Sequence, residues 1–304
     1  MKKIIRLCFC ILALALVVVQ PLTAAAAPLN PEEPCSLTLH YSKEGTAFAD
    51  LDIRIFRVAV YHSDGSYTAT DTFANYPVKI QGMRSQKEWQ ESTTALVSYV
   101  EADALTPTAT AKTDAAGTVV FDNLPTGLYL VMGADARTET GRFRFQPFFI
   151  FLPTPDQFSN YTYQLEANPK PGLVTPISEY TVVKLWKDSA NQKNRPTSVS
   201  VELLKDGVPQ ETVELNQENN WSYTWETTDV NSQWSVAEKN VPAGYTVSVS
   251  SQDGTFTITN EYPQGSDEPP KTGDTAQIWP YVIAMCASGI ALVILGSCRK
   301  RKRS

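Results

Sequence analysis

The chain offers few side chains suited to catalysis. Its 304 residues include only two histidines, His40 and His62, and neither belongs to a Ser/His/Asp arrangement or to the ligand spacing of a metal site. No glycine-rich phosphate loop is visible either. The sequence therefore predicts no enzyme active site, no cofactor and no metal.

The C-terminal end has a pattern typical of a membrane stop-transfer element. An apolar span at residues 278–297 is followed by five consecutive cations at residues 299–303. About 20 apolar residues are enough to cross a bilayer core, and the cations would hold the tail on the cytoplasmic side. We therefore expect a transmembrane helix at residues 278–297.

A short motif just before this span suggests that the anchor is temporary. Pro269-Pro270-Lys271-Thr272-Gly273, the apolar span and the basic tail together resemble the cell-wall sorting signal of Gram-positive bacteria, Leu-Pro-x-Thr-Gly, with Pro269 in place of the usual leucine. The resemblance implies that a sortase cuts between Thr272 and Gly273 and joins the Thr272 carboxyl group to an amine of peptidoglycan or of another subunit. The alternative is a permanent tail anchor without processing.

The N-terminal end is typical of a secretory signal peptide. Three cations within the first six residues precede an apolar run at residues 7–19 and four alanines at residues 24–27. We expect residues 1–26 to be this signal, with cleavage after Ala25 or Ala26.

Removal of both ends changes the charge and the cysteine content. The segment from Ala27 to Thr272 keeps 18 basic and 31 acidic residues, a formal net charge of about −13. Such a surface repels nucleic acid. Cys35 is the only cysteine that remains, so an internal disulfide is excluded and a covalent staple would have to be of another kind.

The remaining residues divide into two β-rich domains. A Pro/Gly-rich stretch at residues 168–172 separates a domain at 28–170 from one at 171–262, and residues 263–304 hold a stalk, the sortase motif, the apolar span and the basic tail. The second domain has seven short alternating runs between turn signals, which favour a Greek-key sandwich. These runs are Tyr180–Trp186, Ser198–Leu204, Glu211–Leu215, Trp221–Trp225, Trp234–Glu238, Tyr245–Ser250 and Thr255–Thr259.

Residues 176–262 resemble the Cna B-type domain of surface adhesins and pilins, an Ig-like β-sandwich. The resemblance implies an isopeptide bond that forms spontaneously between a lysine on the first strand and an asparagine on the last, assisted by an acid. The matching positions are Lys184, Asn260 and Glu238. The motifs that carry it are Lys184-Leu185-Trp186, Val201-Glu202-Leu203-Leu204-Lys205-Asp206-Gly207, Asn220-Trp221-Ser222-Tyr223-Thr224-Trp225, Val241-Pro242-Ala243-Gly244-Tyr245 and Ile258-Thr259-Asn260.

These residue types suit that chemistry. An amine attacks only when neutral, so Lys184 should be buried among apolar side chains such as Trp186 and Trp225, which would lower its pKa. A buried Glu238 with a raised pKa would donate a hydrogen bond to the Asn260 carbonyl and carry the proton to the leaving ammonia. The alternative is a solvated lysine, a turn asparagine and a glutamate at the rim.

The first domain resembles the same fold more distantly. Residues 113–131 are similar to its strand, Leu-Pro-x-Gly turn and tyrosine-containing strand, and the run Leu37–Tyr41 would be its first strand. No lysine lies between Ser36 and Ser42, although Lys43 is near, and Met132-Gly133 stands where the acid is expected. We therefore expect no isopeptide bond in this domain.

The first domain also contains a helical insert. Ser85 and Glu88 have the spacing of a capping box, and Trp89, Leu96 and Val100 then recur on one helical face together with Thr93. We expect a helix packed on the sandwich. The alternative is a face that binds a partner.

Lys170 ends a degenerate version of a pilin motif. Residues 161–170 resemble Trp-x-x-x-Val-x-Val-Tyr-Pro-Lys, in which the lysine accepts the sorting-motif threonine of the next subunit. Only Pro169 and Lys170 are identical to the motif. Proline on both sides of Lys170 disfavours burial in a sheet, so its amine should be accessible. The alternative is an ordinary linker lysine.

Together these features predict a secreted, cell-wall-anchored protein of the Gram-positive surface. Its expected partners are a sortase, peptidoglycan or other pilin subunits, and a host or bacterial surface ligand, with membrane contact only before sorting. A pilin subunit is the leading interpretation, and a monomeric wall-anchored adhesin or stalk is the alternative.

Overall fold

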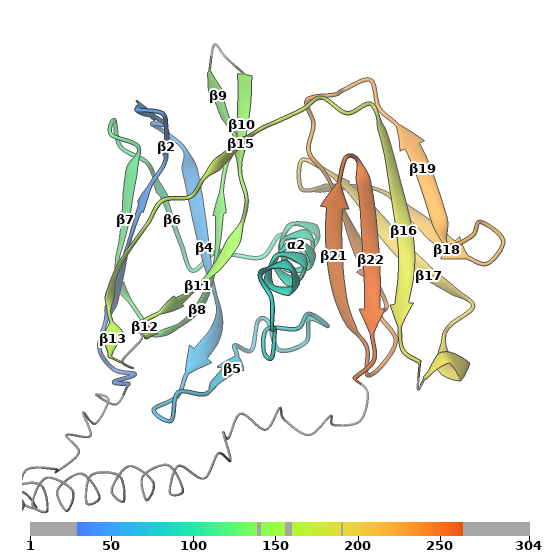
Figure 1. Ribbon diagram of the computed structural model, residues 1–304, viewed down its shortest axis with the longest axis horizontal. Coiled ribbons are helices and arrows are strands. Elements are labelled where there is room, and N and C mark those ends of the chain that lie inside the picture. The colour runs from blue at the N-terminus through green and yellow to red at the C-terminus, as the bar shows by residue number, and fades with distance from the viewer. Residues whose placement is uncertain (1–28, 139–140, 156–159, 190, 264–304) are drawn as a thin grey trace, which may run out of the picture. The chain divides into compact units, whose positions relative to one another are not determined.

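A computed structural model describes residues 29–138, 141–155, 160–189 and 191–263, and these are mostly β-strand, as the sequence predicts (Figure 1). The expected signal peptide, sortase motif (269–273) and transmembrane helix (278–297) lie outside the described residues. Within the described ranges no helix is long and apolar enough to span a membrane.

The strands between residues 35 and 173 form what we call the N-terminal sheets. The largest, with five strands, has the order β11-β8-β4-β5 with β6 also paired to β4, and two three-stranded sheets have the orders β14-β1-β7 and β15-β10-β9. Two short hairpins, β2-β3 and β12-β13, complete the set. The strands are β1 (Cys35–His40), β2 (Ser42–Lys43), β3 (Thr46–Ala47), β4 (Asp52–Tyr61), β5 (Tyr67–Ala69), β6 (Ala109–Lys112), β7 (Thr118–Leu124), β8 (Gly127–Gly133), β9 (Ala136–Thr138), β10 (Gly141–Phe145), β11 (Phe148–Leu152), β12 (Thr154–Pro155), β13 (Tyr161–Thr162), β14 (Gln164–Ala167) and β15 (Pro171–Leu173).

Strand β8 is apolar along almost its whole length because both of its faces are covered. Tyr129 and Val131 pack into a core shared with β1 and β7. Leu130 and Met132, which point to the other face, pack into a second core that includes the helix. The sequence of β8 therefore reads as a continuous apolar run rather than an alternating one.

The strands between residues 179 and 261 form the C-terminal sheets, which have the orders β19-β16-β22-β21 and β18-β17-β20. Each of the seven predicted runs overlaps one of these strands. The first and last strands, β16 and β22, are parallel neighbours. The elements are β16 (Glu179–Lys187), the short 3-10 helix η1 (Gln192–Asn194), β17 (Ser198–Lys205), β18 (Val208–Asn216), β19 (Ser222–Glu226), β20 (Trp234–Lys239), β21 (Thr246–Gln252) and β22 (Thr255–Glu261).

The predicted helix is present as α2 (Gln86–Ala102). The Ser85 hydroxyl caps it by accepting a hydrogen bond from the backbone N–H of Glu88 at 3.2 Å. The Glu88 carboxylate accepts from the backbone N–H of Arg84 rather than that of Ser85, so only half of the expected capping box forms.

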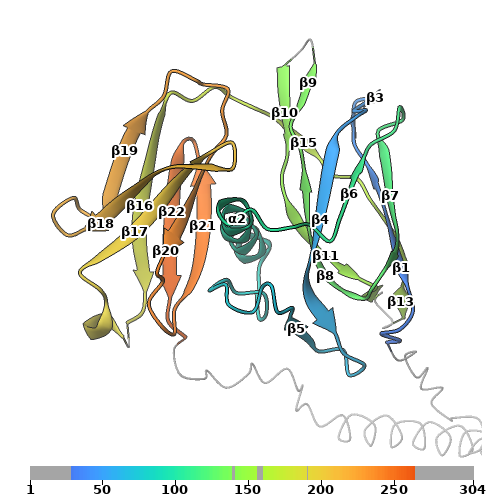
Figure 2. The same ribbon diagram turned by 180° about the vertical axis from the view of Figure 1, so that it is seen from behind.

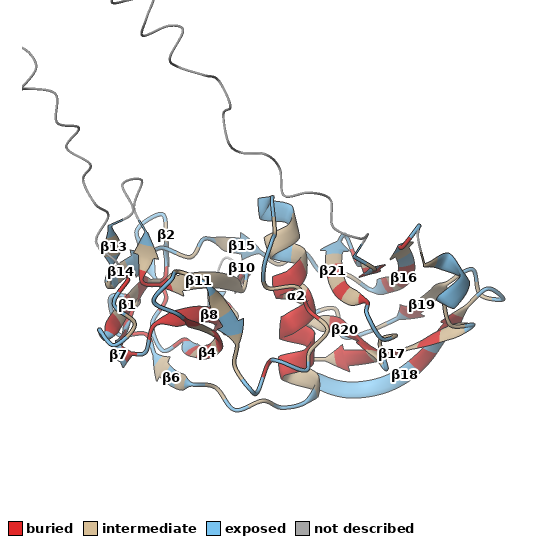
Figure 3. Cartoon of the chain, turned by 90° about the horizontal axis from the view of Figure 1, so that it is seen from below, coloured by how far each residue is buried: buried red, intermediate tan, exposed pale blue. Residues whose placement is uncertain are grey.

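Helix α2 packs on the N-terminal sheets, as expected, and also on the C-terminal sheets, which was not expected. The helix contacts β11 on one side and β20 and β21 on the other, and it shares one apolar core with both groups of strands (Figures 1 and 2). Figure 3 shows its buried stretch, which runs from Ser92 to Val100 except for half-buried Thr94. A helix enclosed in this way needs apolar residues on more than one face.

The expected divider at residues 168–172 is partly strand. Residues 171–173 form β15, which pairs with β10 in the register Phe145 with Pro171 and Phe143 with Leu173. β15 is an edge strand and Pro171 is its first residue, a place where the missing N–H of proline is tolerated.

Candidate functional site

Lys184 and Asn260 lie on neighbouring strands of one sheet and point to the same face. The parallel register of β16 and β22 pairs Lys184 with Ile258 and Trp186 with Asn260. Because side chains alternate between the two faces of a sheet, residues 184, 258 and 260 share a face. That face is the interior, where the Lys184 side chain and the whole of Asn260 are 0% exposed.

Glu238 reaches the same point from the facing sheet. It lies on β20, opposite Val201 of β17, and its side chain is also 0% exposed. Its Oε1 atom accepts a hydrogen bond from Asn260 Nδ2 at 2.7 Å, and its Oε2 atom lies 3.5 Å from Lys184 Nζ. One carboxyl group therefore contacts both the amine and the amide.

The Lys184 amine is confined by its own strand and by an indole ring. Nζ donates a hydrogen bond to the carbonyl of Leu185 at 2.9 Å and lies 4.2 Å from the ring centroid of Trp186. The Trp186 ring in turn packs edge-on against Trp221 and Tyr245.

Trp225 does not have the place expected for it beside Lys184. It pairs with Tyr180, which lies four residues before Lys184 on β16, and its ring packs beside those of Tyr180 and Phe256, which also contact each other. A strand rises about 3.3 Å per residue, so this stack is roughly 13 Å from Lys184 along the strand. Sequence alternation identified Trp225 as buried but could not say at which level of the core.

Burial moves both ionisable groups toward their neutral forms. It lowers the pKa of Lys184 from 10.5 to about 8, and the attraction of the Glu238 carboxylate offsets part of this shift. Burial also raises the pKa of Glu238, and Lys184 offsets part of that shift in turn. An amine and an acid in these states can exchange a proton at low cost.

Two atoms of the cluster have no hydrogen-bond partner among the described residues, namely Asn260 Oδ1 and Glu238 Oε2. The amide is oriented with its nitrogen toward Glu238, which suits an ionised carboxylate. A half-turn of the amide would place Oδ1 against Oε1 and would suit a protonated Glu238 that donates to it. This second arrangement would give the unpartnered Asn260 Oδ1 atom a hydrogen-bond donor.

A second polar cluster borders the site and was missed in the sequence. Asp188, whose side chain is 0% exposed, accepts hydrogen bonds from Arg195 and from the Tyr245 hydroxyl, the latter at 2.7 Å. The Arg195 guanidinium lies 5.5 Å from the ring centroid of Trp186. Asp188 and Arg195 are seven residues apart, and Tyr245 follows 57 residues after Asp188. They follow no common motif, so the fold is needed to identify the cluster.

Lys170 lies between β14 and β15 and is exposed, without a hydrogen bond or ion pair to any described residue. Pro269, Pro270, Lys271, Thr272 and Gly273 lie outside the described residues.

In the N-terminal sheets the residues considered for such a bond are Lys43 and the pair Met132-Gly133. Lys43 lies on β2, half-buried, with Nζ 4.6 Å from the ring centroid of Phe143. Met132 and Gly133 end β8. In the described part of the chain no three His, Cys, Asp or Glu residues gather as a metal site would require.

Comparisons with known proteins find similar sequences and structures among bacterial surface proteins. A collagen adhesin of Staphylococcus aureus is 35% identical over 121 residues, which are 37% of this chain and 10% of that protein, so the chain spans about a tenth of the relative's length. A structure of two B repeat units of the collagen-binding protein of the same organism covers 76% of this chain and 50% of its own, with 18% identity and a TM-score of 0.26.

A structure of the major pilin SpaD of Corynebacterium diphtheriae covers 77% of this chain and 99% of its own, with 12% identity and a TM-score of 0.31. The family model described as the Cna protein B-type domain matches residues 180–261, which confirms for this part of the chain the resemblance inferred from its motifs.

Proposed function

We propose that Lys184 and Asn260 form an isopeptide bond with the help of Glu238. Lys184 Nζ attacks Asn260 Cγ, the Nζ–Cγ bond forms, the Cγ–Nδ2 bond breaks, and Nδ2 leaves as ammonia. Glu238 takes a proton from the amine, donates a hydrogen bond to the amide oxygen, and then returns the proton to the leaving nitrogen. No water or other reactant is consumed.

The observation that carries this proposal is the meeting of three buried groups of complementary chemistry. A lysine amine, a carboxyl group and a carboxamide occupy one apolar interior, and the carboxyl group contacts both of the others. Burial of an unpaired charge costs folding free energy, so a buried ionisable group is expected either to be paired permanently or to react. The pKa directions of Lys184 and Glu238 favour reaction.

The bond would stabilise the C-terminal sheets and carry force. It would close a loop of about 76 residues, which on the chain-entropy model adds about 4 kcal/mol to the free energy of unfolding. β16 and β22 are the first and last strands of these sheets, so a pull applied at their outer ends would pass through the bond and bypass residues 185–259.

The intact mass of the segment 27–272 tests the bond. We expect the wild-type mass to fall short of the sequence mass by one ammonia and Glu238→Ala to have the full mass of its own sequence. Glu226→Ala, which removes an exposed acid from β19, is the matched control and should keep the shortfall. A full sequence mass for the wild type would refute the bond.

At the level of the whole protein, we propose a sortase-processed surface protein, most simply a pilin subunit. The proposal includes two tandem Ig-like domains at 28–170 and 171–262, a signal peptide, and wall sorting through Thr272. The exposed Lys170 supports polymerisation, because its amine is free to attack a sortase acyl-enzyme. The match to a collagen adhesin supports the alternative, a monomeric wall-anchored adhesin or stalk.

Wall extracts from cells that express this protein together with its sortase distinguish a pilin from a monomeric adhesin. A pilin should give a ladder of covalent multimers on denaturing gels, and Lys170→Ala should remove the ladder while monomer remains attached through Thr272. Lys187→Ala, which removes another exposed lysine, should leave the ladder intact. Monomer alone in the wild type would reject the pilin and leave the adhesin.

A further inference from the structure

The C-terminal sheets are not closed by their own strands. β20 ends one sheet and β21 ends the other, so each has an edge without a neighbouring strand in its sheet. Helix α2, which belongs to the first half of the chain, packs against both (Figures 1 and 2). Its Leu96 and Val100 share a core with Val201 and Val236.

The segment before the helix covers the edge of β21. The backbone N–H of Val247 donates a hydrogen bond to the carbonyl of Pro77 at 2.6 Å, and Val78 forms a parallel bridge with Val247. These backbone contacts occupy groups of β21 that would otherwise face water or another strand.

The edge of β20 is held by side chains of α2 and its C-cap. The Tyr99 hydroxyl donates a hydrogen bond to the backbone carbonyl of Glu238 at 2.8 Å, in a buried position. One residue further along β20, the ammonium group of Lys239 lies 3.7 Å from Asp103 and 3.1 Å from Glu202. Tyr99 is therefore attached to the same residue whose carboxyl group contacts Lys184 and Asn260.

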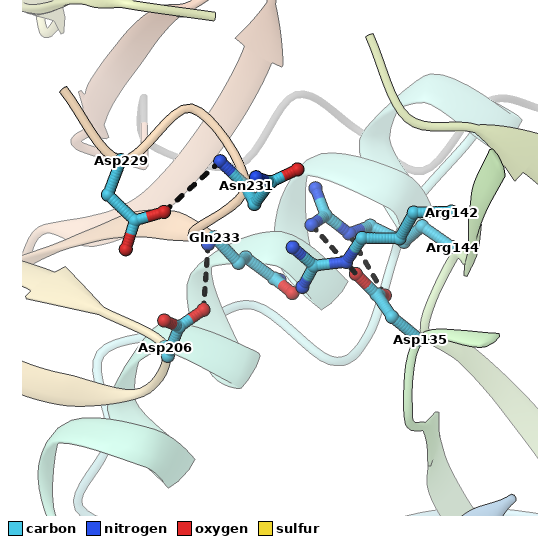
Figure 4. Close-up of polar contacts among 7 residues, drawn as sticks. All are labelled: Asp135, Arg142, Arg144, Asp206, Asp229, Asn231 and Gln233. Atoms are coloured by element: carbon cyan, nitrogen blue, oxygen red, sulfur yellow. Dashed lines mark hydrogen bonds and ion pairs between the residues drawn. The ribbon is translucent and has the colours of Figure 1, made fainter. Parts of the chain in front are cut away.

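The start of β20 is fixed within the C-terminal sheets themselves. The backbone N–H of Gln233 donates to the Asp206 carboxylate at 2.8 Å (Figure 4), and the N–H of Asp206 donates to the carbonyl of Gln233 at 2.7 Å. The beginning of the strand thus depends on the β17–β18 turn. The end of β20, where Glu238 lies, is instead held by α2 through the hydrogen bond from Tyr99.

We propose that Tyr99 is a positioning residue for the isopeptide reaction, and that α2 makes bond formation in the C-terminal sheets depend on the N-terminal half of the chain. This inference rests on the bond proposed above. By fixing the Glu238 carbonyl, Tyr99 holds the carboxyl group between the amine and the amide and keeps water from the end of β20. Without this contact the Glu238 carbonyl would be left buried and unpaired, or water would enter to satisfy it.

Entry of water would change the proton balance of the reaction. The groups facing Glu238 are Lys184 from β16, Asn260 from β22 and the Tyr99 hydroxyl from α2, whereas Lys239 is directed to Asp103 and Glu202. Hydration favours the ammonium–carboxylate pair over the neutral amine and acid that react. The rate of bond formation should therefore fall. Because the ion pair then persists to lower pH, the acidic limb of the plot of rate against pH, where the rate drops as the pH falls, should move to lower pH.

The test compares Tyr99→Phe with Tyr76→Phe in the segment 27–272, which includes the whole described part of the chain. Both changes remove one phenol hydroxyl from this interface, but the Tyr76 hydroxyl donates to Asp103 and not to β20. Each protein is made by cell-free synthesis, synthesis is stopped, and the loss of ammonia is followed by intact mass at several pH values. Circular dichroism checks that each variant is folded.

We expect Tyr99→Phe to form the bond about fivefold more slowly than wild type, the factor that corresponds to one lost hydrogen bond, with its acidic limb at lower pH. Tyr76→Phe should match wild type both in the rate of bond formation and in the pH of the acidic limb. A Tyr99→Phe rate equal to that of Tyr76→Phe, or a slower rate with an unmoved limb, would overturn the positioning role. In either case ammonia loss by the wild type would leave the bond itself standing. If the wild type never loses ammonia, both proposals are wrong.

Discussion

Replacement of Lys184 by methionine should lower the melting temperature far more than its change in packing would. Methionine fills a similar volume without a charge, and the remaining acid keeps its hydrogen bond from Asn260. Without the lysine, the pKa of Glu238 rises further, because Lys184 is the attraction that offsets its burial. Glu238 should then stay neutral and add little cost of its own.

The expected loss is therefore mainly that of the cross-link, about 4 kcal/mol. Because α2 joins both groups of strands in one core, we expect residues 29–263 to unfold together. For a unit of that size a loss of 1 kcal/mol lowers the melting temperature by roughly 2–4 °C, so Lys184→Met should melt about 8–16 °C below wild type.

Scanning calorimetry of the segment 27–272 measures this difference. Lys187→Met, an exposed lysine on the same strand, is the control and should change the free energy of unfolding by no more than about 0.5 kcal/mol. If Lys184→Met melts within about 3 °C of Lys187→Met, no stabilising cross-link is present and the reasoning fails.

Three further predictions concern pH, the second polar cluster and the surface lysine. In Asn260→Ala the Lys184 amine stays free with a lowered pKa, so between pH 8 and 10.5 the unfolded chain binds more protons than the folded chain. The free energy of unfolding of this variant, measured in urea, should therefore rise with pH across that window relative to cross-linked wild type. The same pH dependence in both proteins would contradict this prediction. Arg195→Gln leaves the Asp188 carboxylate without its cation and should lower the free energy of unfolding in urea by about 1–3 kcal/mol. Arg195→Lys should recover only part of this loss, because one ammonium group cannot replace the two contacts of the guanidinium. An unchanged urea midpoint for Arg195→Gln would refute this prediction. A fluorescent amine-reactive ester should label the exposed Lys170 and leave Lys184 unlabelled, because Lys184 is buried and the proposed bond consumes its amine; an unlabelled Lys170 would show that its amine is not accessible.

Local patterns predicted most of the secondary structure. Alternation located the strands of the C-terminal sheets, because most of them have one buried and one less buried face, as the pattern of Ser198–Lys205 shows; β20 is an exception, since its four central residues are all buried. The capping spacing of Ser85 and Glu88 located the start of α2. The pairing of Pro171–Leu173 with β10 was missed, because a proline-rich stretch gives no alternation and its strand character comes only from its neighbour.

The surroundings of the site could be predicted only in part. Family motifs named Lys184, Glu238 and Asn260, and the fold brings these three together. No sequence signal indicated that Tyr99 contacts the Glu238 carbonyl, because the contact joins residues 139 positions apart through a backbone atom, which carries no side-chain identity. The same holds for Asp188 and Arg195, whose ion pair depends on how the chain turns after β16.

The most direct test of the account is a peptide map of the wild-type segment 27–272. After proteolysis we expect one branched peptide that contains both Lys184 and Asn260, with a mass smaller by one ammonia than the sum of its two linear parts and with fragment ions that place the link between these two residues. Two separate linear peptides, each at its full sequence mass, would contradict the account.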